Sequence, residues 1–286
     1  MEGTVSIRGT GHSLQTAVLL FSLLFVASCA PVSRSTLEGA LKQGFVEILF
    51  RTERFTLFGL LRSGRGETLH VYVEGDGHAW ETSRRPSADP TPRNPVALRL
   101  AMADETGVPV LYLARPCQYV QRSDRCGCHA RYWTSARLCE EVIASLDDAV
   151  SQAKSRAGTR NVALFGFSGG GGAAVLIAAR RGDVACLATV AGLLDTDGWT
   201  TRMHVSPLTE SLNPLKVAPR LRSLPQLHLC SQSDKIIPLE IVSSFCVALG
   251  RPECLEKLEC MDHGGDWDEV WPSLLHNLLI GQRLSQ

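Results

Sequence analysis

A serine set among glycines is the part of this sequence best suited to chemistry. Ser168 lies in a Gly-Phe-Ser-Gly-Gly segment at 166–170, after an apolar run at 162–165 and before a run of small residues at 171–181. A strand, a tight turn carrying a serine and a following helix form a nucleophile elbow, which holds the hydroxyl exposed at the carboxyl edge of a sheet. The glycines leave room for a strained turn against neighbouring backbone. We therefore predict that Ser168 is a nucleophile.

A glycine-rich turn between a strand and a helix can instead bind a phosphate. The dinucleotide fingerprint G-x-G-x-x-G would need glycine where Ser168 stands, and it usually lies in the first βα unit rather than mid-chain. A Walker loop needs a G-K-[ST] sequence, which is absent. The sequence therefore favours the nucleophile, and it indicates no cofactor and no metal.

A serine hydroxyl is a weak nucleophile that needs a base, and the base needs an orienting carboxylate. We predict that His263 is the base, because it follows the last predicted strand in a loop beside two glycines, where a mobile base would lie. We predict that Asp234 is the acid, because it follows the second-last predicted strand. The alternatives are His204, His228 and His276 for the base, and Asp195 and Asp197 for the acid.

Two backbone N–H groups should stabilise the oxyanion that forms when the serine attacks. One donor is expected from Gly169, the residue after the nucleophile. The other is expected from the loop at 74–77 after the third predicted strand, where we favour the amide of Asp76 over that of Gly77. A plain Asp-Gly turn is the structural alternative for this loop.

The elements needed to position these groups can be found along the chain. Apolar and β-branched runs predict strands, and amphipathic or capped segments predict helices between them. The strands are expected at 45–51, 55–62, 69–73, 108–114, 162–165, 184–190, 226–230 and 254–260, and the helices at 94–105, 134–154, 171–181, 238–249 and 266–284. This alternation predicts an α/β protein with a mostly parallel, doubly wound sheet and helices on both faces. The poorly periodic segment 193–224 is a possible small cap.

The N-terminus has the features of an export signal. Arg8 is the only Lys or Arg before an apolar run at 17–27, which is too short for a comfortable membrane span. This run ends in Val-Ala-Ser followed by Cys29, which resembles the bacterial lipobox and implies cleavage before Cys29 and lipid on that residue. The alternative is an ordinary signal peptide. We thus expect a lipoprotein-type signal peptide at 1–28, a tether at 29–44 and one domain at 45–286, anchored in the cell envelope. Because Ala30 is not Asp, the outer membrane facing the periplasm is expected.

The composition suits one globular domain with a sizeable core. Apolar residues make up 44% of the chain, and the net charge is zero, so nucleic acid is not an expected partner. Ten cysteines are present, and an oxidising compartment favours disulfides over zinc for the group at 117, 126, 128 and 139. Cys254 is expected to pair with Cys246 or Cys260, and Cys186 is expected to be a buried free thiol.

Several short blocks together resemble the α/β-hydrolase superfamily from about Phe45 onward, and within it a group of bacterial lipoprotein-type serine hydrolases of undefined substrate. These blocks lie at 73–77, 115–119, 132–134, 166–171, 189–192, 211–214 and 234. The resemblance implies a Ser-Asp-His triad, for which Ser168, Asp234 and His263 are in the matching places. One departure is the Ser-Gln-Ser sequence before Asp234, where such enzymes often carry glycine.

Two classes of function are compatible with these residues. The first is a serine hydrolase that acts on a small-molecule or lipid-like ester, thioester or amide through an acyl-enzyme, most simply a carboxylic ester. An acyltransferase would use the same residues with an alcohol in place of water. The second class is a non-catalytic, lipid-anchored envelope binding protein on a hydrolase scaffold, because a fold does not fix a function.

Overall fold

The computed structural model describes residues 1–3, 32–125 and 127–284. The predicted signal peptide, the lipidation residue Cys29 and Cys126 lie outside the described residues. Contacts group the chain from Val32 onward into one unit, and this unit carries the fold described below. Within the described part of the chain, no helix is both long enough and apolar enough to cross a membrane.

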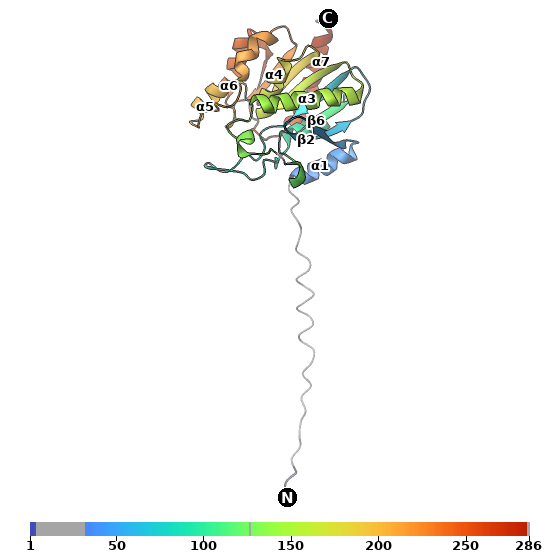
Figure 1. Ribbon diagram of the computed structural model, residues 1–286, viewed down its shortest axis with the longest axis vertical. Helices are drawn as coiled ribbons and strands as arrows, with labels where there is room; N and C mark the ends of the chain where they lie inside the picture. Colours follow the sequence, from blue (N-terminus) through green and yellow to red (C-terminus); the bar gives the residue numbers. More distant parts are fainter. Residues whose placement is uncertain (4–31, 126, 285–286) are drawn as a thin grey trace. The chain divides into compact units, whose positions relative to one another are not determined.

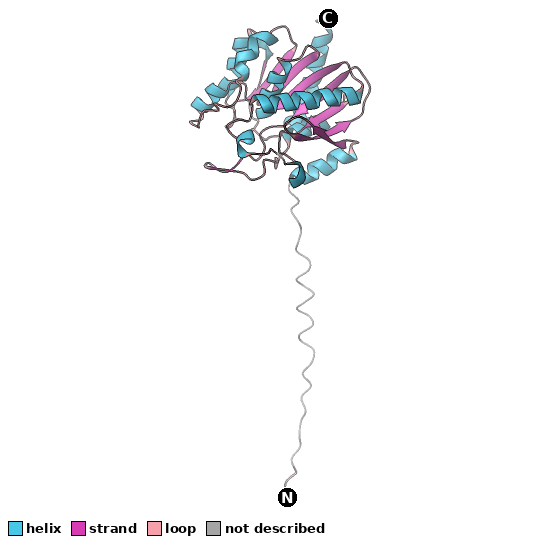
Figure 2. Ribbon diagram, viewed as in Figure 1, coloured by secondary structure: helices cyan, strands magenta, loops and turns pink. Residues whose placement is uncertain are grey.

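An eight-stranded sheet runs through the unit (Figure 2). Its strands, in spatial order, are β1 (Val46–Arg51), β2 (Thr56–Arg62), β6 (Val110–Leu113), β3 (Thr68–Val73), β7 (Asn161–Phe167), β8 (Val184–Val190), β9 (Gln226–Ser231) and β10 (Leu255–Leu258). The pairs β1–β2 and β2–β6 are antiparallel, and all other neighbours are parallel. A separate small hairpin consists of β4 (Trp80–Thr82) and β5 (Arg85–Pro86).

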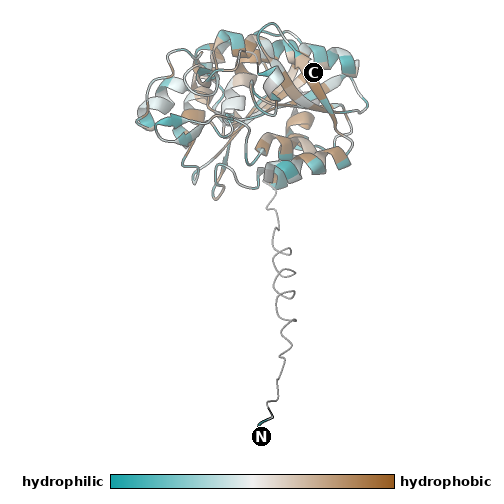
Figure 3. Cartoon of the chain, turned by 60° about the horizontal axis from the view of Figure 1, so that its bottom comes forward, coloured by the Kyte–Doolittle hydropathy of each residue, from teal (hydrophilic) through white to brown (hydrophobic). Residues whose placement is uncertain are grey.

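Helices cover both faces of this sheet. One apolar layer contains α3 (Glu140–Ala157), α4 (Gly169–Ala178) and α6 (Leu239–Leu249), and α3 crosses in front of the strands in Figure 1. The other layer contains α1 (Val32–Lys42), α2 (Val96–Met102) and α7 (Trp267–Leu284). Side chains of β7 alternate between the two layers, with Val162 and Leu164 in the first and Ala163 and Phe165 in the second. Hydrophobic residues accordingly follow the strands in Figure 3. The predicted α/β class and doubly wound sheet are confirmed.

The expected tether differs from the structure. Residues 32–42 form helix α1, which lies within the 29–44 range that we assigned to a tether. Ala40 is fully buried in the second layer, Leu37 packs against that layer, and Ser33 is hydrogen-bonded to the Tyr119 hydroxyl. These contacts give the segment a stable place on the domain, so the folded unit begins at Val32 rather than at Phe45.

Two helix starts also differ from the prediction. The long helix begins at Glu140 instead of Thr134 or Ser135, because 130–133 form a short 3-10 helix and Arg137 is turned toward the site described below. The earlier helix, α2, begins at Val96 without a side-chain cap, since the Asn94 amide donates instead to the Gly264 carbonyl.

The possible cap is a mixed segment rather than a separate layer. It contains α5 (Thr196–Arg202) and a 3-10 helix at Pro214–Leu221. Asp195 caps α5, and Asn213 links Asp195 to Asp197. These bonds fix α5 beside the carboxyl edge of the sheet.

The cysteines follow the expected chemistry in part. Cys117 and Cys128 form a disulfide, and Cys186 is a buried free thiol as predicted. The sulfur of Cys254 lies 3.4 Å from that of Cys246, whereas Cys260 is exposed. Of the two partners considered for Cys254, the fold therefore places Cys246 next to it.

Candidate active site

The turn at Ser168 has the geometry of an elbow. Ser168 follows β7 and precedes α4, and its backbone has φ 53° and ψ −122°, a conformation that non-glycine residues rarely adopt. Side chains at Gly166 and Gly170 would collide with backbone atoms of Gly170 and of the end of β3, respectively. The glycines are thus required by close backbone approach, and the strained turn projects the Ser168 side chain at the carboxyl edge of the sheet.

The structure brings the three predicted triad residues into one hydrogen-bonded line. Ser168 Oγ lies 3.1 Å from His263 Nε2, and His263 Nδ1 lies 2.8 Å from Asp234 Oδ2. The Asp234 side chain is fully buried, whereas that of His263 is 19% exposed. Each residue follows a different strand of the parallel sheet, β7, β9 and β10, so the carboxyl edge gathers groups that are far apart in sequence.

Neighbouring groups hold Asp234, the predicted acid, in place. The second oxygen of Asp234, Oδ1, accepts hydrogen bonds from the amides of Ile236 and Ile237 at 2.8 and 2.9 Å. Ser231 belongs to the Ser-Gln-Ser sequence where related enzymes often carry glycine. Its hydroxyl oxygen accepts hydrogen bonds from the amides of Ser233 and Met261. Its hydroxyl therefore connects the loop that carries the acid to the loop that carries the base.

His263, the predicted base, is also supported from two sides. The His263 ring lies against the Phe167 ring, with centroids 4.9 Å apart. Trp267, at the start of α7, donates from its indole nitrogen to the His263 carbonyl at 3.0 Å. The first contact supports the His263 ring, and the second holds the backbone of the loop that carries it.

The alternative bases lie elsewhere. His204 and His276 are exposed, and His228 is buried with Thr189 on one ring nitrogen and Gln226 on the other. Burial, with a smaller contribution from Arg251, lowers the pKa of His228 to about 3, so it stays neutral.

The predicted oxyanion loop lies directly against the elbow. A side chain added to Gly75 would meet Ser168 Cβ at 3.3 Å, and one added to Gly169 would collide with the Asp76 carboxylate. The Gly169 amide is the first of α4, where an N–H has no intrahelical acceptor. Within the described residues, the Asp76 amide donates to no protein acceptor. Both amides are thus available beside the serine.

Sequence reasoning missed two arginines that bind Asp76. The guanidinium of Arg137 lies 2.6 Å from Asp76 Oδ2, and that of Arg115 lies 3.4 Å from Oδ1. Both side chains are more than nine-tenths buried. Two cations facing one carboxylate leave one net positive charge beside the elbow. Arg115 lay in a block that carried the family resemblance, but Arg137 lay in a segment predicted to be helical, so only the fold could place it here.

Gln118 and Glu74 hold the backbone of the same loop. The Gln118 amide donates to the Gly75 carbonyl at 3.0 Å, and Glu74 Oε1 accepts from the Gly75 amide at 2.9 Å. The other oxygen of Glu74 has no hydrogen-bond partner among the described residues. Burial raises the pKa of Glu74 to about 7, although the amides of Gly75 and Ala97 oppose the shift.

We expect Glu74 to make stability pH-dependent. Its pKa is higher in the folded than in the unfolded state, so the folded protein binds the proton more tightly. The resulting stabilisation is fully present below about pH 4.5 and is lost as the pH rises through about 7. A pKa of about 7 against the usual 4.5 corresponds to about 3 kcal/mol in the free energy of unfolding. Glu74→Gln should remove this slope.

The measurement is urea unfolding at pH 5 and pH 8 for the wild type and Glu74→Gln. Glu47→Gln is the matched control, because Glu47 is exposed on β1. From pH 5 to pH 8, the free energy of unfolding should fall more for the wild type and for the control than for Glu74→Gln. Parallel changes in all three proteins would mean that Glu74 is ionised across this range.

One further group could offer metal ligands. His228, Cys246 and Cys254 each have a potential ligand atom within 4.8 Å of the others. Both ring nitrogens of His228 are already hydrogen-bonded, so the imidazole has no free lone pair directed at an ion. Cys117 and Cys128 are joined to each other, which removes them as thiolate ligands.

Comparison with known proteins identifies the fold. No family model matches the chain, and no curated protein matches it. Solved structures do match, each over 82% of this chain. An α/β serine hydrolase homologue from Coxiella burnetii is 16% identical, with 96% of that chain covered and a TM-score of 0.55. An esterase from Pyrococcus furiosus is 15% identical (89% of that chain covered, TM-score 0.57), and an α/β serine hydrolase without a lid from Xanthomonas campestris is 13% identical (94% covered, TM-score 0.55). The chain has the α/β-hydrolase fold.

Proposed function

We propose that the protein is a serine hydrolase that works through an acyl-enzyme. The proposal depends above all on the continuous hydrogen-bonded line from Ser168 through His263 to Asp234. In this line, His263 takes the proton of Ser168 as the oxygen attacks the carbonyl carbon, and Asp234 stabilises the imidazolium. His263 then returns the proton to the leaving group. Water then attacks the acyl-enzyme with the same proton transfers, and the carboxylic acid product is released.

The oxyanion is stabilised by the amides of Gly169 and Asp76. The α4 N-terminus adds its dipole at the same point, and α4 has ten residues. Arg115 and Arg137 hold the Asp76 carboxylate, which fixes the position of the Asp76 amide. They also leave one net positive charge beside the negative charge that develops. In a buried site this charge is weakly screened by solvent, so it favours the transition state.

Carboxylic esters are the proposed substrate class. The fold is shared with an esterase and with serine hydrolases, and a Ser-His-Asp line needs no metal for an activated acyl group. Transfer of the acyl group to an alcohol would use the same residues, and the fate of the acyl-enzyme distinguishes the two reactions.

We also propose that the enzyme is a lipoprotein of the bacterial cell envelope, anchored through Cys29 and facing the periplasm. The support is the lipobox-like sequence that ends at Cys29. The Cys117–Cys128 disulfide agrees with an oxidising compartment.

One experiment tests both proposals. The full chain is expressed in a bacterium that processes lipoproteins, the cells are fractionated, and each fraction is treated with a fluorophosphonate, which phosphonylates an activated serine. We expect labelling in the membrane fraction, mapped to Ser168 by peptide mass spectrometry and absent after denaturation. Cys29→Ser should keep the label but move it to the soluble fraction. Ser168→Ala should remove the label and leave the protein in the membrane.

The outcomes separate the two claims. A folded wild type that is not labelled would contradict the hydrolase and favour a binding protein on a hydrolase scaffold. Labelled protein that stays in the membrane after Cys29→Ser would contradict the lipid anchor alone.

A further inference from the structure

A large cavity adjoins the candidate site and is not used by the triad. Its volume is about 820 Å³, and a second cavity of about 440 Å³ contains Ser168 and His263. Trp80, Arg137 and Trp199 line both cavities. A ligand bound to Ser168 can therefore extend past these three side chains into the larger space.

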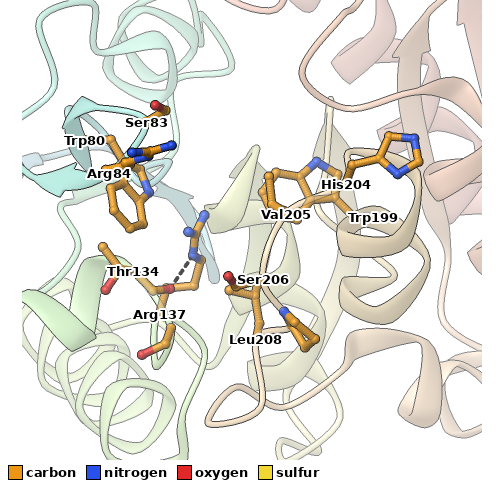
Figure 4. Close-up of a pocket in the computed structure, with 12 residues that line it drawn as sticks. Trp80, Ser83, Arg84, Thr134, Arg137, Trp199, His204, Val205, Ser206 and Leu208 are labelled. Carbon is orange, nitrogen blue, oxygen red and sulfur yellow. Dashed lines mark hydrogen bonds between the residues drawn. The ribbon is translucent and has the colours of Figure 1, made fainter.

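Two indoles face this space from separate elements. Figure 4 shows Trp80 on the small β4–β5 hairpin at one side and Trp199 on α5 at the other, with Arg137 between them. Trp199 is fixed by a 2.8 Å hydrogen bond from its indole nitrogen to the Ile236 carbonyl. Trp80 is 43% exposed. Walls of this kind favour a flat, apolar body that can stack between them.

The charge lining the larger cavity is positive. Arg84 and Arg137 line it, and none of the described lining residues is acidic. The Arg137 charge is partly satisfied by Asp76, and its guanidinium also lies 5.6 Å from the Trp199 ring centroid. The Arg84 side chain, in contrast, is exposed at the rim of this cavity, and its guanidinium has no hydrogen-bond or ion-pair partner among the described residues. A guanidinium left free at a cavity wall suits a carboxylate, which it can bind through two parallel N–H groups.

We infer that the larger cavity binds an aromatic carboxylate, so that the substrate is an ester carrying a flat aryl group with a negative charge. The ring would lie between Trp80 and Trp199, and the carboxylate would lie at Arg84. This inference rests on the proposed function for the ester bond, whereas the binding of the aryl carboxylate rests on the cavity alone.

The test compares two ligands of nearly equal shape, 4-phenylbenzoate and its neutral amide, 4-phenylbenzamide. Binding is followed by tryptophan fluorescence, to which the accessible Trp80 and Trp199 should respond. The wild type should bind the carboxylate about fivefold more tightly than the amide, because solvent weakens an ion pair with an exposed guanidinium. Arg84→Gln should remove most of this preference without weakening the amide. Trp80→Leu should weaken both ligands.

Arg85→Gln is the matched control. Arg85 is the next residue, carries the same charge and is exposed like Arg84, but it does not line the cavity. It should keep the preference within about twofold, since an exposed charge beyond the site acts weakly through solvent. The inference would be overturned if the wild type bound the carboxylate and the amide with equal affinity. It would also be overturned if Arg84→Gln and Arg85→Gln lost the preference for the carboxylate to the same extent.

A second readout connects the cavity to the reaction. Saturating 4-phenylbenzoate should slow fluorophosphonate labelling of Ser168, because a bound aryl group blocks the approach to the serine. Tight binding with unchanged labelling would overturn the assignment of this cavity to the substrate. If the wild type is not labelled at all, the proposed function fails, while the fluorescence titrations still decide what the cavity binds.

Discussion

Ser168→Ala should lower kcat for 4-nitrophenyl acetate by about 10⁴-fold or more, with little change in the melting temperature. The hydroxyl supplies the attacking oxygen, and its hydrogen bond to His263 at 3.1 Å contributes little to folding beside the apolar packing of α4. Steady-state kinetics and a thermal melt measure the two effects. Ser151→Ala is the matched control, because this hydroxyl lies within α3, where it donates to the Asp147 carbonyl and accepts from Arg181, and it lines neither cavity.

The same experiment should include His263→Ala and the double variant. Residues that act as one unit are not additive, so His263→Ala should cost nearly as much as Ser168→Ala, and the double variant little more. Additive losses would mean that the two residues act in separate steps. Turnover unchanged in Ser168→Ala would show that another residue is the nucleophile.

Asp234→Asn should lower kcat by about 10³- to 10⁴-fold, although it alters only one group. The amides of Ile236 and Ile237 both donate to Asp234 Oδ1, so the oxygen of the new amide will stay at that position. Its NH₂ group must then face His263 Nδ1 and donate to it. The imidazole is thereby held with its proton on Nε2, which faces Ser168 and can no longer accept the serine proton.

The control for this change is Asp262→Asn, which removes an exposed charge next to His263 in sequence. It should keep kcat within a few-fold. Fluorophosphonate labelling gives a second measurement, and its rate should fall with kcat in Asp234→Asn. A melt is needed because Asp234 is buried and its amide bonds contribute to the loop. A folded Asp234→Asn protein with near-normal turnover would contradict the assigned role of the carboxylate.

The parts of the site predicted from sequence are those governed by local sequence and chain order. The elbow at Ser168 depends on an apolar strand, close glycines and a following helix, all within about twenty residues. The positions of Asp234 and His263 follow from the rule that strand ends meet at one sheet edge. The fold was predictable for the same reason, because strands buried on both faces are recognisable as continuous apolar runs.

The parts that were missed depend on contacts between distant segments. Arg137 was assigned to a helix because the apolar residues that follow it have helical spacing. Its ion pair is instead with Asp76, 61 residues away, and α3 begins only after it, at Glu140. Helix α1 was missed because its burial depends on the second apolar layer, which forms from later parts of the chain. The facing pair Trp80 and Trp199 could not be predicted, since nothing in either local sequence indicates the other.

The order of the site residues along the chain has a consequence for synthesis. Ser168 is made 95 residues before His263, the base of the proposed mechanism, and His263 follows β10, the last strand of the sheet in chain order. Until β10 pairs with β9, the serine is an ordinary alcohol of low reactivity. In the proposed mechanism, the nascent chain therefore carries no activated nucleophile until β10 and the loop after it have been made.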